Sequence, residues 1–154
     1  MREGFLGTAA PFYADLVLLL ELSMGAGLLL GLLLARTGKF RAHGACQSII
    51  VLLNVGVIAL VMLPSFRHQV APRIPLKLGK TFYALATIHA AFGAIVECAA
   101  LYILLAAGTT LLPEKLRLTH YKLWMRTVLA SWWLAILWGV ATYARWYIPA
   151  IFRR

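Results

Sequence analysis

The chain has 154 residues, of which 62% are hydrophobic and 13% are charged, and its mean hydropathy is +0.84. A water-soluble domain of this size does not need so much apolar sequence to fill one core, so the composition excludes that class and indicates an integral membrane protein. A formal net charge of +10 would suggest nucleic acid in a soluble protein. Here the basic residues lie at the ends of apolar segments, where they meet lipid headgroups, and we expect no nucleic-acid partner.

Four apolar runs are long enough to cross a hydrocarbon layer about 30 Å thick, which takes roughly 20 residues of helix. They cover about residues 11–36, 42–64, 81–110 and 119–148. The runs are continuous rather than alternating, which is typical of helices and not of barrel strands. The sequence therefore predicts an all-α integral membrane protein, a bundle of four transmembrane helices that forms a single domain over residues 1–154.

The first predicted helix contains glycines and a deeply placed acid. Gly25, Gly27 and Gly31 stand among leucines, and small residues of this kind let helices approach closely in lipid. The carboxyl group of Glu21 costs several kcal/mol in a bilayer unless it is protonated or paired. We therefore expect Glu21 to face the bundle interior, either hydrogen-bonded to a neighbouring helix or handling protons.

The second predicted helix has one polar face. At 100° per residue, His43, Gln47 and Asn54 lie within about 40° of one another. Polar side chains lined up along a lipid-buried helix point at other helices, so we expect interhelical hydrogen bonds from Gln47 and Asn54.

The segment after the second helix is predicted to be a loop. Pro64 is expected to end the helix, and Pro72 and Pro75 are expected to keep part of residues 65–80 extended. The loop is basic, with Arg67, Arg73, Lys77 and Lys80.

Histidines mark the third and fourth predicted helices. His89 lies about nine residues into the third helix, roughly 13 Å of helical rise, and Gly93 follows four residues later. A glycine beside a histidine makes room for a flat ligand or for a close neighbouring helix, and the sequence favours the close helix. His120 opens the fourth helix, which carries all five tryptophans, and Trp132 and Trp133 lie too deep for the interfacial aromatic belt.

The four histidines divide by depth into two pairs, because successive helices alternate in direction. His43 and His120 begin their helices on one side, and His68 and His89 lie toward the other side. Two histidines on facing helices are the ligand set of a b-type haem. We predict all four as cofactor-binding haem-iron ligands, with copper as the alternative metal; headgroup or loop contacts are the alternative roles for His43, His68 and His120.

Three segments carry a resemblance: RTGKFRAHGACQ at residues 36–47, ATIHAAFGA at 86–94, and LTHYKLWMR at 118–126 followed by WWLAILWGVATY at 132–143. They resemble a family of small four-helix bacterial membrane proteins of unknown function, often associated with haem–copper oxidases and their assembly. The matching positions are His43, His68, His89, His120, Trp132, Gly139 and Tyr143. The resemblance implies a bacterial inner membrane, and as partners lipids and the other membrane subunits of a respiratory complex.

Three functions are consistent with these features. The first is a haem-binding electron-transfer or accessory subunit of a respiratory complex, with bis-histidine haem b. The second is an oxidase assembly factor that handles haem or copper, and the third is a cofactor-free structural membrane subunit. Catalysis by the chain alone is not expected, because the sequence has no nucleophile–base constellation, no phosphate loop and no metalloprotease spacing.

Overall fold

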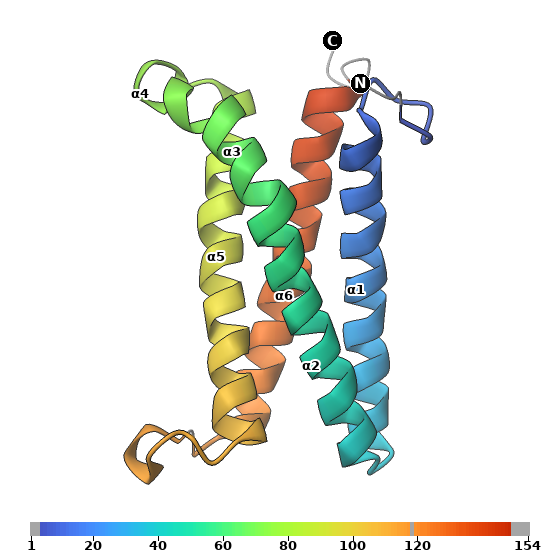
Figure 1. Ribbon diagram of the computed structural model, residues 1–154, viewed down its shortest axis with the longest axis vertical. Helices are drawn as coiled ribbons and strands as arrows, with labels where there is room; N and C mark the ends of the chain where they lie inside the picture. The colour runs from blue at the N-terminus through green and yellow to red at the C-terminus, as the bar shows by residue number, and fades with distance from the viewer. Residues whose placement is uncertain (1–3, 118, 149–154) are drawn as a thin grey trace.

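Four long helices run side by side in the computed structural model, which describes residues 4–117 and 119–148 (Figure 1). Each is long and apolar enough to cross a membrane, the second when taken with the helical segment that continues it to Lys77. This confirms the predicted all-α bundle of four transmembrane helices, and the chain is an integral membrane protein. The long helices are α1 (Phe12–Arg36), α2 (Phe40–Val57), α5 (Thr81–Gly108) and α6 (Tyr121–Tyr147).

The segment after α2 is helical, so the predictions that Pro64 ends the helix and that residues 65–80 are partly extended are wrong. Pro64 lies in the first turn of α3, directly after the wider π-helical turn η1, where its missing N–H and its ring are accommodated. Pro72 and Pro75 also lie in first turns, a position that proline favours. The elements here are η1 (Ile58–Met62), α3 (Leu63–Gln69), the 3₁₀ turn η2 (Ala71–Arg73) and α4 (Ile74–Lys77).

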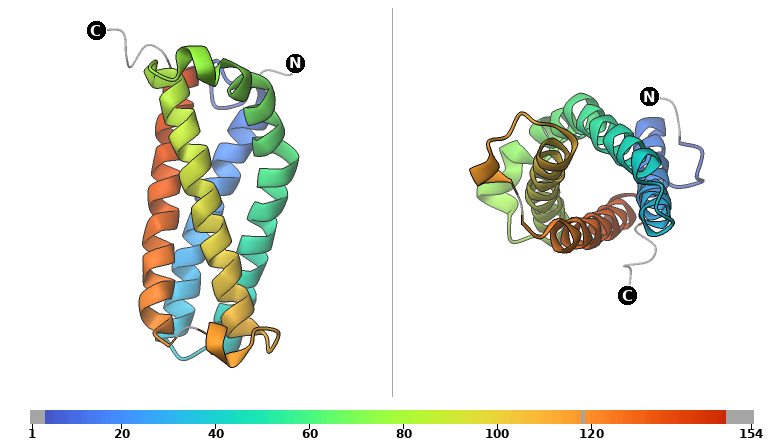
Figure 2. Two further views of the ribbon diagram at one scale, coloured as in Figure 1. Left: turned by 90° about the vertical axis from the view of Figure 1, so that its left-hand side faces the viewer. Right: turned by 90° about the horizontal axis from the view of Figure 1, so that it is seen from below.

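The bundle has two distinct ends. The start of α1, the end of α6 and the helices α3 and α4 lie at one end, which we call the terminal end (Figures 1 and 2). The α1–α2 connection and the α5–α6 connection, with its 3₁₀ turn η3 (Glu114–Leu116), lie at the opposite end. His43 and His120 therefore share the opposite end, as the alternation of helix direction predicts.

The core lies at mid-height, where all four long helices contribute. Its buried residues are Met24, Leu28, Ile50, Val51, Val96, Ala100, Trp132 and Ile136. The glycines of α1 make this packing close: a Cβ added to Gly25 would lie 2.7 Å from Ile136 Cδ1 on α6, and one added to Gly27 would lie 2.8 Å from Ile50 Cδ1 on α2. The expectation that these small residues permit close helix approach is confirmed.

Candidate functional site

Two of the cavities along the bundle lie on either side of the core, and each contains one of the predicted histidines; His89 and Glu21 also line a smaller cavity of about 180 Å³. The first, which we call the His43 cavity, has a volume of about 290 Å³ and lies toward the opposite end. The second, the His89 cavity, has a volume of about 520 Å³ and lies toward the terminal end. Trp132, only 3% exposed, lines both cavities and stands between them. This explains why a tryptophan occurs so far from the membrane surface.

The His43 side chain is oriented by a bond to the neighbouring helix. Its Nδ1 lies 2.8 Å from the carbonyl oxygen of Gly31 on α1. A carbonyl only accepts hydrogen bonds, so Nδ1 is the donor and, in the neutral ring, Nε2 keeps its lone pair. Metal-binding histidines commonly have this arrangement, with one ring N–H held by a backbone carbonyl and the other nitrogen left for the metal.

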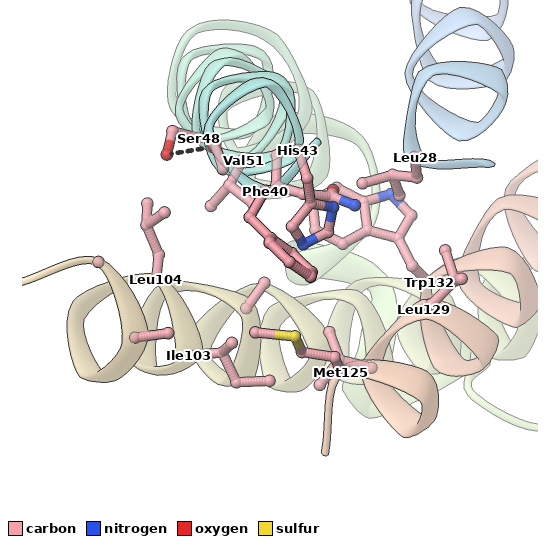
Figure 3. Close-up of a pocket in the computed structure, with 16 residues that line it drawn as sticks. Leu28, Phe40, His43, Ser48, Val51, Ile103, Leu104, Met125, Leu129 and Trp132 are labelled. Carbon is pink, nitrogen blue, oxygen red and sulfur yellow. Dashed lines mark hydrogen bonds between the residues drawn. The ribbon is translucent and has the colours of Figure 1, made fainter. Parts of the chain in front are cut away.

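The walls of the His43 cavity are mostly apolar, as Figure 3 shows. His43 and Phe40 extend from α2 toward α5 and α6, where Ile103 and Met125 line the cavity. Gly44 also lines it, and a Cβ added there would meet nothing within 4 Å. The cavity thus combines one imidazole, one thioether sulfur and open space beside the histidine.

Basic side chains surround the end of the bundle nearest this cavity. Arg41 follows the α1–α2 connection, and Lys122 and Arg126 lie in the first turns of α6; all three are exposed. They give this end the positive charge that carboxylate groups of a ligand would need.

A set of polar side chains from three helices lines the His89 cavity, and we call this set its polar floor. Asn54 Nδ2 of α2 donates a 2.8 Å hydrogen bond to Glu97 Oε2 of α5, and both residues are buried. Glu21 of α1 and His89 of α5 complete the floor. Four of its atoms are buried without a hydrogen-bond partner: Glu21 Oε1, Asn54 Oδ1, His89 Nδ1 and Glu97 Oε1.

Helix packing beside His89 differs from the expectation. The imidazole lies against Gly139 of α6, where an added Cβ would be 3.0 Å from His89 Cε1. Gly93, which the sequence suggested as the contact point of a close helix, has nothing within 4 Å of an added Cβ and lines the cavity instead. That suggestion is wrong, because the space beside Gly93 belongs to the cavity.

The remaining two histidines are exposed. His68 lies in the last turn of α3 at the terminal end. His120 is the residue before α6, and its Nδ1 lies 2.9 Å from the hydroxyl of Thr119. Neither lines the His43 cavity or the His89 cavity.

Each cavity therefore contains one of the four histidines, and the pairs His43/His120 and His68/His89 do not share a cavity lining. Among the described residues, no group of three or more His, Cys, Asp and Glu side chains is arranged to hold a metal ion. The assignment of the four histidines as iron ligands stays a prediction.

A buried hydrogen-bond cluster at the terminal end was not predicted from the sequence. Asp15 is fully buried and accepts bonds from the backbone N–H groups of Phe5 (2.7 Å) and Leu6 (2.8 Å) and from the Tyr143 hydroxyl (2.5 Å). The same hydroxyl lies 2.7 Å from Thr8 Oγ1. The cluster fastens the N-terminal segment to α1 and α6; an acid in the first turn of a helix was the available signal.

A scan against models of protein families found no match, and neither did comparisons with curated proteins and with solved structures. The class of protein therefore comes from the fold, and the function has to be argued from the two cavities.

Proposed function

We propose that this protein is a haem-binding accessory membrane subunit of a respiratory complex in the bacterial inner membrane, with His43 as the protein ligand of the iron. The observation that carries the proposal is the 2.8 Å contact between His43 Nδ1 and the Gly31 carbonyl, which leaves Nε2 available at an apolar cavity. A haem bound there would be held through the His43 imidazole. The cavity of about 290 Å³ lies just below the range of about 300–1,000 Å³ of small-molecule pockets, so its apolar walls would contact only part of the macrocycle.

Open space and positive charge near His43 match this ligand. Gly44 leaves open space beside the imidazole, and Arg41, Lys122 and Arg126 at the same end match the negative charge of haem propionates. The His89 cavity fits less well, because its floor contains the carboxyl groups of Glu21 and Glu97. His43 is for this reason the ligand that we propose.

One imidazole in the cavity favours an accessory role over a permanent bis-histidine electron carrier. Since the lining offers one imidazole, a second protein ligand for the iron would come from a neighbouring subunit of the complex. Copper is the less favoured metal, since a copper site usually combines several nitrogen or sulfur ligands and this lining offers one imidazole and the Met125 thioether.

The test is a haem titration of the detergent-purified protein and of four single His→Ala variants, followed by visible absorption. We expect His43→Ala to weaken binding by at least about ten-fold, equal to about 1.4 kcal/mol. His120→Ala is the matched control, because His120 lies at the same end but does not line the cavity.

Equal losses in His43→Ala and His120→Ala would restore the bis-histidine pair and an electron-transfer role. Unchanged binding in His43→Ala would overturn the proposal. Failure of the wild-type protein to bind haem would leave the structural subunit as the working function.

A further inference from the structure

The polar floor of the His89 cavity lacks partners that a folded protein normally provides. Asn54 and Glu97 are 7% and 6% exposed, yet Asn54 Oδ1 and Glu97 Oε1 have no hydrogen-bond partner, and neither has Glu21 Oε1. Buried polar atoms are almost always hydrogen-bonded, since an unpaired one costs free energy. Three unpartnered oxygens on residues that line one cavity therefore indicate a molecule that donates hydrogen bonds there.

The cavity opens sideways into the bilayer. Its lining includes residues of α5 and of the η1–α3 segment. Leu63 of α3 and Ala91 and Ala94 of α5 line it and are exposed. Ala94 lies at the middle of the 28-residue helix α5, so the opening faces acyl chains rather than water. A ligand that enters here must be lipophilic.

Aromatic side chains indicate the shape of the head group. Phe66 of α3 and Trp132 and Trp146 of α6 line the cavity, and aromatic rings favour stacked or edge-to-face contact with another flat ring. The unpartnered oxygens come from three helices, Glu21 from α1 and the hydrogen-bonded Asn54–Glu97 pair from α2 and α5. An aromatic ring with hydroxyl groups at opposite ends matches this arrangement.

We propose that the His89 cavity binds a lipophilic hydroquinone from the bilayer, with one hydroxyl donating to the Asn54–Glu97 oxygens and the other to Glu21. The volume of about 520 Å³ lies within the range of about 300–1,000 Å³ that small-molecule pockets have. Mostly apolar walls with a few convergent polar groups are also typical of such pockets. This site is separate from the proposed haem site, and neither proposal depends on the other.

Binding is tested with decylubiquinol, a short-chain hydroquinone, added to detergent-purified protein and separated from free ligand by size exclusion. The dimethyl ether of the same compound serves as the chemical control, because it has the same ring and chain but no hydroxyl donors. We expect saturable binding of the hydroquinone and binding of the ether that is at least about ten-fold weaker. Equal retention of both compounds would show partition into detergent only and would overturn the proposal.

Two variants place the site. Gly93→Leu fills the cavity at a position with free space and should abolish binding, whereas Gly44→Leu fills the His43 cavity in the same way and should leave it unchanged. Asn54→Leu combined with Glu97→Leu removes the acceptors together with their shared bond and should weaken binding at least about ten-fold. Circular dichroism checks that each variant is folded. A folded Gly93→Leu variant that binds the hydroquinone with wild-type affinity would refute this location. Loss of haem binding in Gly44→Leu, with haem binding retained in Gly93→Leu, would show that the two sites are separate.

Discussion

The hydrogen bond between Asn54 and Glu97 links α2 to α5, and both residues are buried. Replacing either residue by leucine leaves the other polar group buried and without its bond, which costs about 1–3 kcal/mol. Replacing both removes the bond and the buried polar groups together, which is often nearly neutral. We therefore expect each single change to destabilise the protein by about 1.5 kcal/mol and the double change by less than about 1 kcal/mol, a coupling of about 2–3 kcal/mol.

The coupling is measured by unfolding the purified protein with SDS in mixed micelles and following the loss of structure by circular dichroism. The control pair is Leu53→Ala and Ile95→Ala, because these side chains are 46% and 67% exposed on the same two helices. Their effects should add to within about 0.5 kcal/mol. If the effects of the Asn54 and Glu97 changes on the free energy of unfolding also add, the buried bond between α2 and α5 does not stabilise the bundle as the structure indicates.

Two further substitutions test the packing. Gly25→Leu should destabilise the bundle by about 1–3 kcal/mol, since its Cβ would lie 2.7 Å from the buried Ile136 side chain. The control is Gly44→Leu, whose new side chain enters open space. Equal SDS-unfolding midpoints for the two variants would contradict this prediction. Tyr143→Phe removes the donor to Asp15 and should speed chymotrypsin cleavage of the N-terminal segment by about two- to ten-fold. An unchanged cleavage rate would show that this bond does not hold the segment.

The polar face of α2 was predictable because it depends only on helical spacing. His43, Gln47 and Asn54 recur on one side of the helix, and in the structure His43 contacts the Gly31 carbonyl of α1 while Asn54 bonds to Glu97 of α5. The bilayer enforces this result, because a polar side chain that faced lipid would have no partner. The prediction of an interhelical hydrogen bond is confirmed for Asn54. Gln47, for which the same bond was predicted, packs against Gly31 of α1, where an added Cβ would lie 2.6 Å from its Nε2.

The effect of Pro64 was not predictable from local rules. A proline inside a helix removes one hydrogen bond and crowds the preceding turn, which usually ends or kinks the helix. Here the π-helical turn Ile58–Met62 precedes it and changes the hydrogen-bond register, so that the helix continues to Gln69. A π-helical turn has no distinctive sequence pattern, so the run of apolar residues did not predict it.

The cavities could not be predicted from the sequence either, because they depend on how the helices pack. Whether Gly93 faces a neighbouring helix or open space depends on how far α5 lies from η1 and α3, and that distance follows from the packing of the whole bundle. Which histidines face a cavity depends in the same way on the rotation of each helix. The sequence could identify His43 and His89 as candidates, but the contact of His43 with Gly31 and the open space beside Gly93 required the structure.

The central claim is that His43 binds haem iron, and a reduced-minus-oxidised visible spectrum of the purified protein tests it most directly, with iron and copper quantified on the same sample. We predict a haem spectrum with one iron per chain in the wild-type protein loaded with haem, and loss of both in His43→Ala. A colourless wild-type protein without iron after loading, or an unchanged spectrum in His43→Ala, would contradict the claim.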